Sequence, residues 1–77
     1  MKNKVHFKDI TALQKFVTDI SEFKCDVNLY DNHNCLDAKS IMALMNLDLQ
    51  KQFVVEVISG DNKELARMSE VLKEYEV

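Results

Sequence analysis

The apolar residues of this chain change their spacing several times, and these changes limit the folds that it can adopt. Apolar and polar residues alternate over residues 2–7, 25–30 and 53–58, as in strands that bury one face. Residues 10–23 and 65–75 instead carry apolar residues at steps of three or one, which is typical of amphipathic helices. A further strand and a short helix fit between residues 35 and 47.

The resulting order is βαββαβα. Since each helix and each strand has a single apolar face, we predict an α+β open-faced β-sandwich. Its four-stranded antiparallel sheet should carry all three helices on one face. We expect residues 1–77 to form one domain, because a chain of 77 residues is long enough for one apolar core and too short for two.

Both long helices have recognisable start signals. Asp9 is the predicted N-cap of the first helix, where its carboxylate can accept from first-turn amides. Asp61 and Glu64 form a capping-box pattern before the last helix. The predicted apolar face of the first helix comprises Ile10, Leu13, Phe16, Val17, Ile20 and Phe23.

The polar run between residues 31 and 34 predicts a hairpin turn. If Asn32 and His33 are its two central residues, Leu29 pairs with Leu36 on the buried face. His33 would then need a positive φ, which Asn, Asp and His tolerate better than most residues. The alternation of the flanking strands agrees with this register.

The cysteines do not indicate a disulfide or a metal centre. In the predicted register Cys35 pairs with Tyr30 on one face of the sheet, whereas Cys25 lies on the other, so both should be free thiols. His33, Asp31, Cys35 and Asp37 alternate across the hairpin and its turn and are not expected to converge on one ion. We therefore expect no metal, no cofactor and no acid-base pair.

The composition excludes several classes of function. A single glycine cannot build a glycine-rich phosphate loop, and a net charge of −3 does not favour nucleic acid or anionic lipid. No apolar run approaches the roughly 18 residues of a membrane span, and no signal-peptide core follows the first residues. We expect a cytoplasmic protein, not an enzyme, since so short a chain leaves little room for a deep cavity.

Residues 40–47 predict a short helix of about two turns that begins at Ser40. Such a helix cannot bury all its apolar residues against one sheet. With Leu44 and Leu47 directed inward, Met42 and Met45 should remain near the surface. The more ordinary interpretation is that Ser40 is only a helix cap and that the methionines belong to the core.

The segment 37–47, DAKSIMALMNL, resembles the regulatory-serine region of HPr, the histidine phosphocarrier of the bacterial sugar phosphotransferase system. The preceding hairpin and helix fall at the spacing of that family, whose fold matches the predicted order. By this resemblance Ser40 lies where a dedicated kinase phosphorylates some family members, although Ala43 replaces the usual glycine. The resemblance also implies that Lys39, Ile41, Met42 and Met45 contact partner proteins.

The family's Gly-Ile-His-Ala-Arg-Pro signature, which holds the phosphorylated histidine, is missing. A gapless alignment places Asp9 at the histidine position, Thr11 at the arginine and Ala12 at the proline. Phosphohistidine chemistry needs an imidazole at the helix N-terminus, where amides stabilise the added dianion. Asp9 supplies a repelling carboxylate instead. The resemblance therefore implies a relative that does not transfer phosphoryl groups.

We accordingly expect a regulatory binding protein, a monomer or weak dimer. The implied partners are proteins of the phosphotransferase system or of carbon-catabolite control, including an HPr kinase acting on Ser40. Two alternatives stay open. The chain could be a working phosphocarrier that uses His6, or a structural module that dimerises through an uncovered sheet face carrying Tyr30, Val54 and Ile58.

Overall fold

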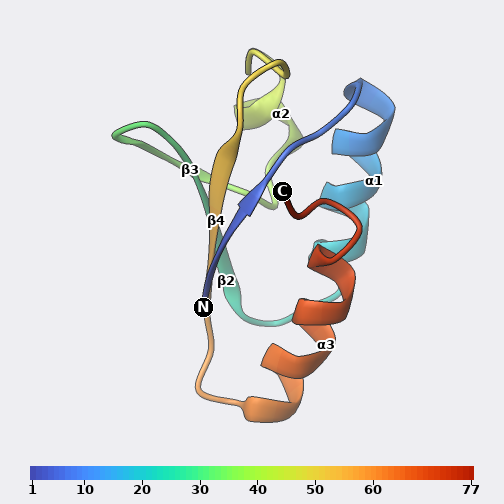
Figure 1. Ribbon diagram of the computed structural model, residues 1–77. Coiled ribbons are helices and arrows are strands. Elements are labelled where there is room, and N and C mark those ends of the chain that lie inside the picture. Colours follow the sequence, from blue (N-terminus) through green and yellow to red (C-terminus); the bar gives the residue numbers. More distant parts are fainter.

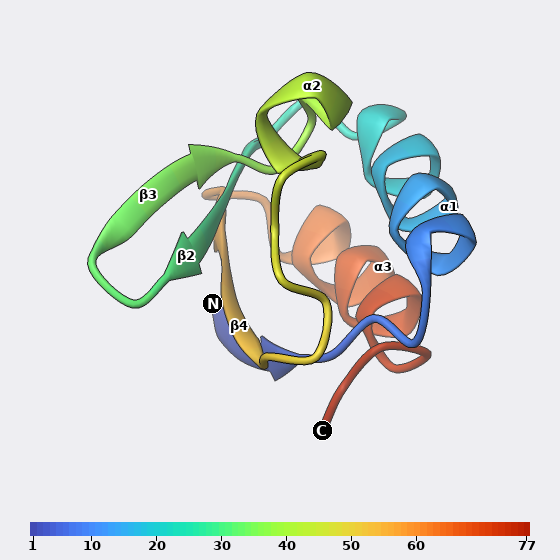
Figure 2. The same cartoon turned by 90° about the horizontal axis from the view of Figure 1, so that it is seen from above.

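A computed structural model describes residues 1–77 and has the predicted order of elements. Helices α1 and α3 lie side by side on one face of the sheet, α2 lies on the same side near one end, and the opposite face is uncovered (Figures 1 and 2). None of the helices is both long and apolar enough to cross a bilayer. The elements are β1 Lys2–Val5, α1 Ile10–Ser21, β2 Asp26–Asp31, β3 Asn34–Asp37, α2 Ile41–Leu44, β4 Phe53–Ile58 and α3 Asn62–Leu72.

The sheet has the strand order β1-β4-β2-β3, and every neighbouring pair is antiparallel. The predicted hairpin register is confirmed, since Leu29 pairs with Leu36 and Tyr30 with Cys35. The residue with a positive φ is Asn32, at 55°, so the expectation for His33 was wrong. Asparagine is one of the few residues that adopts this left-handed conformation readily, and here the first turn residue takes it.

The C-terminal segment adds an unpredicted pairing along the outer edge of β1. Glu76 forms an isolated antiparallel bridge with Val5. The amide of His6 donates to the Tyr75 carbonyl at 2.9 Å, and the amide of Val77 donates to the Lys4 carbonyl at 3.0 Å. This edge of the sheet is therefore covered, whereas no strand of this chain pairs with the outer edge of β3.

The core lies between the helices and the sheet, and all its buried residues are apolar or aromatic. Its aromatic part joins three distant segments: the ring centroid of Phe16 lies 5.0 Å from that of Phe7 and 5.3 Å from that of Tyr75. Phe7 is fully buried although β1 ends at Val5, earlier than the predicted residue 7. The strand ends there because the chain leaves β4 to enter α1 (Figure 1).

Two helical predictions need correction. Ile10 is 41% exposed, because it occupies the first position of α1 and the buried residues of that helix begin at Leu13. Helix α2 has one turn, from Ile41 to Leu44, instead of two. The amide of Leu47 donates to the Leu44 carbonyl at 3.2 Å, so the chain closes a tight turn where the second helical turn was expected.

Both predicted charged caps are present. Asp9 Oδ1 accepts from the Ala12 amide, and Asp61 accepts from two amides of the first turn of α3. The capping box is indirect: the Asp61 amide donates to Ser59 Oγ at 3.1 Å, and Ser59 Oγ donates to Glu64 Oε1 at 2.8 Å. The serine thus relays a bond that glutamate makes directly in a standard capping box.

Candidate functional site

Ser40 is the N-cap of α2. Its backbone is extended, with φ −100° and ψ 102°, so its side chain can fold back onto the first turn. Its Oγ accepts from the Ala43 amide at 3.3 Å, which is long for such a bond. The side chain is half-buried. Ser40 therefore places a hydroxyl at a helix N-terminus and makes only one weak bond with it.

The turn before Ser40 is fixed by the sheet. Ala38 is fully buried, and its amide donates to the Val27 carbonyl at 3.0 Å. Asp37 Oδ1 accepts from the Lys39 amide at 3.0 Å, while the Asp37 carbonyl accepts from the Ser40 amide at 3.1 Å. These bonds hold the start of α2 against the end of β3.

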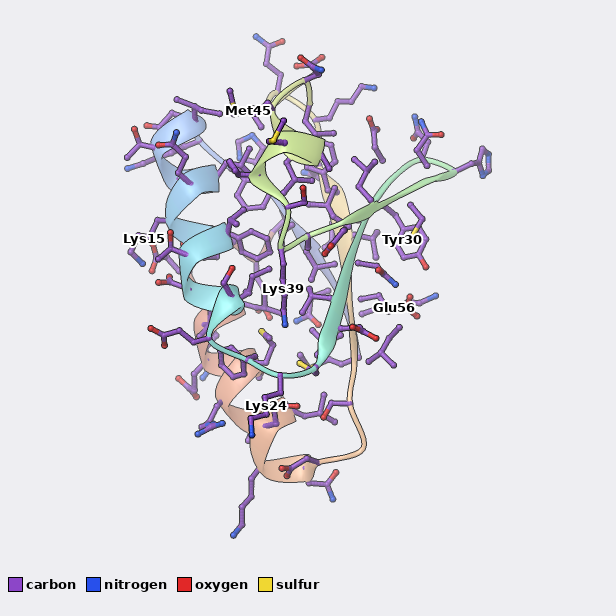
Figure 3. The ribbon with its side chains drawn as sticks, turned by 180° about the vertical axis from the view of Figure 1, so that it is seen from behind. Lys15, Lys24, Tyr30, Lys39, Met45 and Glu56 are labelled. Atoms are coloured by element: carbon purple, nitrogen blue, oxygen red, sulfur yellow. The ribbon has the colours of Figure 1, made fainter.

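The two faces of α2 differ in burial, as predicted. Leu44 is fully buried, whereas Met42 is 83% and Met45 is 55% exposed. Ile41 is half-buried and packs against the core. Figure 3 shows the Met45 side chain on the outside of α2. We call Ser40, Ile41, Met42 and Met45 together the α2 surface.

The fifth residue expected at this site, Lys39, points elsewhere. Its Nζ donates to the Phe23 carbonyl, in the connection between α1 and β2. Figure 3 shows the side chain running away from Met45, towards the region of Lys24. The structure thus brings Ser40 and the methionines together but directs the ammonium group of Lys39 to the far end of α1.

The N-terminus of α1 is occupied by its own carboxylate. Asp9 Oδ1 accepts from the Ala12 amide at 2.8 Å, and the Asp9 carbonyl accepts from the Leu13 amide at 3.2 Å. His6 is exposed and lines a hollow of about 160 Å³ with Lys8, Ala12, Glu74 and Tyr75. The nearest imidazole therefore lies beside the first turn of α1, while the cap position itself holds an anion.

Sequence reasoning missed an ion-pair cluster that ties α1 to the C-terminal segment. Lys15 Nζ lies 3.0 Å from Glu74 Oε1 and 3.1 Å from Asp19 Oδ2, and 5.9 Å from the centre of the Tyr75 ring. The Glu74 and Asp19 carboxylates raise the pKa of Lys15. The spacing of Lys15 and Asp19 was a visible signal, but the Glu74 contact depends on tertiary structure. Figure 3 labels Lys15 on α1.

A second polar cluster lies on the uncovered face of the sheet. Tyr30 Oη donates to Glu56 Oε1 at 2.8 Å, and Lys2 Nζ lies 4.0 Å from Glu56 Oε2. The pKa of Tyr30 is raised to about 12, mainly by the hydrogen bond to Glu56 and to a smaller extent by an interaction with the Cys35 thiol. Figure 3 shows Tyr30 and Glu56 together on the side of the sheet away from the helices.

Neither cysteine is in a disulfide. Cys25 is buried, which raises the pKa of its thiol, and Cys35 is exposed. No group of three His, Cys, Asp or Glu side chains is arranged to hold a metal ion. The arrangement offers a hydroxyl and an exposed apolar helix face, and these features suit binding and modification.

A protein-family model described as "PTS HPr component phosphorylation site" matches residues 9–75. The chain belongs to this family. The match spans α1 to the end of the C-terminal helical region, so it covers both the Asp9 cap and the α2 surface of this HPr-like protein. No curated protein matches the chain. Membership makes it a phosphocarrier-like protein related to the phosphotransferase system, and members of this family are carriers, not enzymes.

Proposed function

We propose that this HPr-like protein is a cytoplasmic regulatory protein that does not itself transfer phosphoryl groups. It binds proteins of the phosphotransferase system or of carbon-catabolite control through the α2 surface. The observation that supports this most strongly is the 83% exposure of Met42 beside the Ser40 hydroxyl. A one-turn helix whose only fully buried side chain is Leu44 leaves this apolar side chain free to contact a partner.

The methionines suit a surface that accepts several partners. Met42 and Met45 are unbranched, and their thioethers adapt to differently shaped apolar pockets. Large exposed apolar side chains that lie together mark interaction sites more often than scattered ones do. Ile41 links the α2 surface to the core, because its side chain packs against the core while remaining partly accessible to solvent.

Ser40 is the proposed modification site. A phosphate there adds roughly −1.5 to −2 charges at the N-terminus of α2, where free amides favour an anion. The long bond from the Ala43 amide can pass from the hydroxyl to a phosphate oxygen without loss of the cap. The Asp37 carboxylate opposes the added charge, and the Lys39 ammonium is already bonded to Phe23. Because the cap bond from the Ala43 amide can be retained, phosphorylation would alter the surface that partners meet and leave the fold in place.

The first experiment adds HPr kinase and ATP to the protein. One phosphate is expected per chain by intact-mass measurement, and none on a Ser40→Ala variant. Ser21→Ala is the matched control, because Ser21 Oγ donates only to the Val17 carbonyl within α1. An equal gain in mass in the wild type and the Ser40→Ala variant would show that Ser40 is not the phosphorylated residue.

The docking role of the methionines has a separate test. Met42→Asp is expected to lower kcat/KM of the kinase for this protein by about tenfold, equivalent to roughly 1.4 kcal/mol, as for a moderately important interface residue. Ala66→Asp on exposed α3 should leave it unchanged. Equal loss in both variants would mean that the effect is one of general charge and not of docking.

A second candidate function, phosphoryl transfer by His6, is favoured by one observation. His6 shares its hollow with Lys8 and with Ala12 of the first turn of α1, so an imidazole and a cation lie near a helix N-terminus. Incubation with phosphoenolpyruvate and the first enzyme of the system distinguishes the two functions. An acid-labile phosphate that His6→Ala abolishes would establish the carrier function, and no incorporation would exclude it.

A further inference from the structure

The uncovered face of the sheet carries charge of opposite sign at its two edges. The strand registers place its outward side chains in rows that cross all four strands. The edge strand β1 contributes lysines to these rows, and the opposite edge strand β3 contributes an aspartate. The first row is Lys2, Glu56, Asn28 and Asp37, and the second is Lys4, Val54, Tyr30 and Cys35.

The two central strands can be covered over these two rows without leaving a charge unpaired. Val54 and Tyr30 are half-buried, and Ile58 is 52% exposed. Two carboxylates stand on the central strands of this face. That of Glu56 already accepts from Tyr30 Oη and lies 4.0 Å from Lys2 Nζ, whereas that of Asp26 is exposed opposite Ile58, where β2 begins and β4 ends. Burial of the Glu56 carboxylate would therefore cost less than burial of an isolated one.

We propose that this face binds a second copy of the chain, face to face, about a two-fold axis that runs parallel to the strands between β4 and β2. Rotation about this axis places β1 of each copy over β3 of the other. Lys2 of one copy then faces Asp37 of the second copy, and Val54 faces Tyr30. Each of these contacts occurs twice, as an isologous interface requires, and sheets packed this way keep their strands within about 30° of each other.

The charge pattern selects this arrangement over its alternative. A two-fold axis across the strands would place β1 over β1, so that lysines would face lysines. Pairing through the outer edge of β1 is blocked by the bonds from His6 to Tyr75 and from Val77 to Lys4. Electrostatic complementarity of this kind fixes orientation and excludes wrong pairings more than it raises affinity.

The size of the face predicts a weak dimer. Four strands spaced about 4.8 Å apart cover a width of only roughly 15 Å. Because the strands have only 4 or 6 residues, each about 3.4 Å long, we expect two such faces to bury less than the roughly 1,200 Å² of a stable interface. We expect dissociation constants in the range of about 10⁻⁵ to 10⁻³ M, so measurements must extend to millimolar protein. Untagged chain is needed, because the Met1 amine donates to the Val57 carbonyl beside this face.

The test is a charge exchange followed by sedimentation equilibrium at low salt. Lys2→Glu and Asp37→Lys should each weaken self-association at least tenfold, because each homodimer then contains two repulsive pairs. An equimolar mixture of the two variants should associate at least as well as the wild type, because both cross-pairs become attractive. A mixture that stays monomeric, or a wild-type protein that is monomeric at millimolar concentration, would overturn the proposal.

Two further variants separate charge from folding. Asp37 Oδ1 also accepts from the Lys39 amide, so Asp37→Lys could loosen the turn before α2. Asp37→Asn keeps this acceptor and removes the charge, and it should weaken the dimer by a smaller factor than Asp37→Lys. Met42→Asp lies on the other side of the molecule and should leave self-association unchanged, whatever it does to kinase docking. Loss of the dimer in Met42→Asp, or none in Asp37→Asn, would contradict the proposal.

Discussion

Helices α1 and α2 begin with the same type of N-cap but differ in the charge of the cap, in length and in the number of side chains that they bury. Each starts after an extended residue whose side-chain oxygen accepts from an amide three residues on. In α1 the cap is the Asp9 carboxylate at 2.8 Å, and in α2 it is the Ser40 hydroxyl at 3.3 Å. Helix α1 then buries four side chains over 12 residues, whereas α2 buries one over four.

Under the proposed function, this difference distinguishes a helix end that only stabilises the fold from one whose hydroxyl is modified. The N-terminus of α1 already holds a negative charge, so a phosphoryl group on a neighbouring imidazole would meet a repelling anion there. The N-terminus of α2 holds a neutral hydroxyl with one long hydrogen bond. Because α2 is too short to bury both faces, its outer side chains stay exposed beside that hydroxyl.

The largest expected effect tests whether α2 depends on its single buried side chain. Leu44→Ala should lower the free energy of unfolding by about 2–4 kcal/mol, since Leu44 is fully buried. Met42→Ala should change it by less than about 0.5 kcal/mol. Urea denaturation followed by circular dichroism measures both. A loss in Met42→Ala comparable to that in Leu44→Ala would show that the outer face of α2 is not free.

The next effect concerns the charged cap of α1. Asp9→Ala should cost about 1–2 kcal/mol, because it removes both the bond from the Ala12 amide and the charge at the helix end. Asp9→Asn keeps an acceptor and should cost about half as much or less. The same denaturation assay applies. Equal losses in the two variants would assign the whole effect to the charge.

The neutral cap of α2 should matter less. Ser40→Ala is expected to cost about 0.5–1 kcal/mol, because its bond from the Ala43 amide is long and the helix has only one turn. Amide hydrogen exchange at Ala43 should accelerate in this variant, and Ser40→Asp should restore the protection. If Ser40→Ala proved more costly than Asp9→Ala, the contrast between the two helix ends would be reversed.

The smallest expected effect is a pH dependence of stability at the start of α3, which has a carboxylate in its first turn, and none at the start of α2, whose cap is neutral. Bonds from Ser59 Oγ and the Lys24 amide to Glu64, in the first turn of α3, lower the pKa of that carboxyl below its ordinary 4.5. Its stabilising contribution is thus present above about pH 4.5 and is lost as the pH falls through the lowered pKa.

Protection of the amides at the start of α3, measured as exchange relative to the intrinsic rate at each pH, should consequently fall in acid in the wild type and much less in Glu64→Gln. Ser40 does not titrate, so exchange at Ala43, referred to the intrinsic rate, should not follow this change. Acid-dependent opening of both helix ends together would indicate global unfolding and not a local effect of Glu64.

Most of the fold could be predicted from the sequence, because the spacing of apolar residues in each segment indicates whether that segment forms a helix or a strand. The alternation of β4 and the pairing of Leu29 with Leu36 required only short-range patterns. The pairing of Glu76 with Val5 could not be predicted, because it joins the two ends of the chain. Residues 75–77 follow α3 and have no pattern of their own that indicates a contact with β1. The exposure of Ile10 likewise depends on where the core begins.

The candidate site was predictable in composition but only partly in geometry. Ser40 as a cap and the exposure of Met42 followed from helix spacing and from the limited area of one sheet face. The orientation of Lys39 did not, because its long side chain finds the Phe23 carbonyl only after α1 and the loop before α2 have packed. The same holds for Lys15, whose partner Glu74 is distant in sequence.

A single phosphorus-31 NMR experiment tests the contrast between the two helix ends most directly. The protein is incubated with phosphoenolpyruvate and the first enzyme of the system in one tube, and with HPr kinase and ATP in another. We predict no protein-bound signal in the first tube and one acid-stable phosphomonoester, lost in Ser40→Ala, in the second. A phosphoramidate signal in the first tube that acid removes would contradict the account.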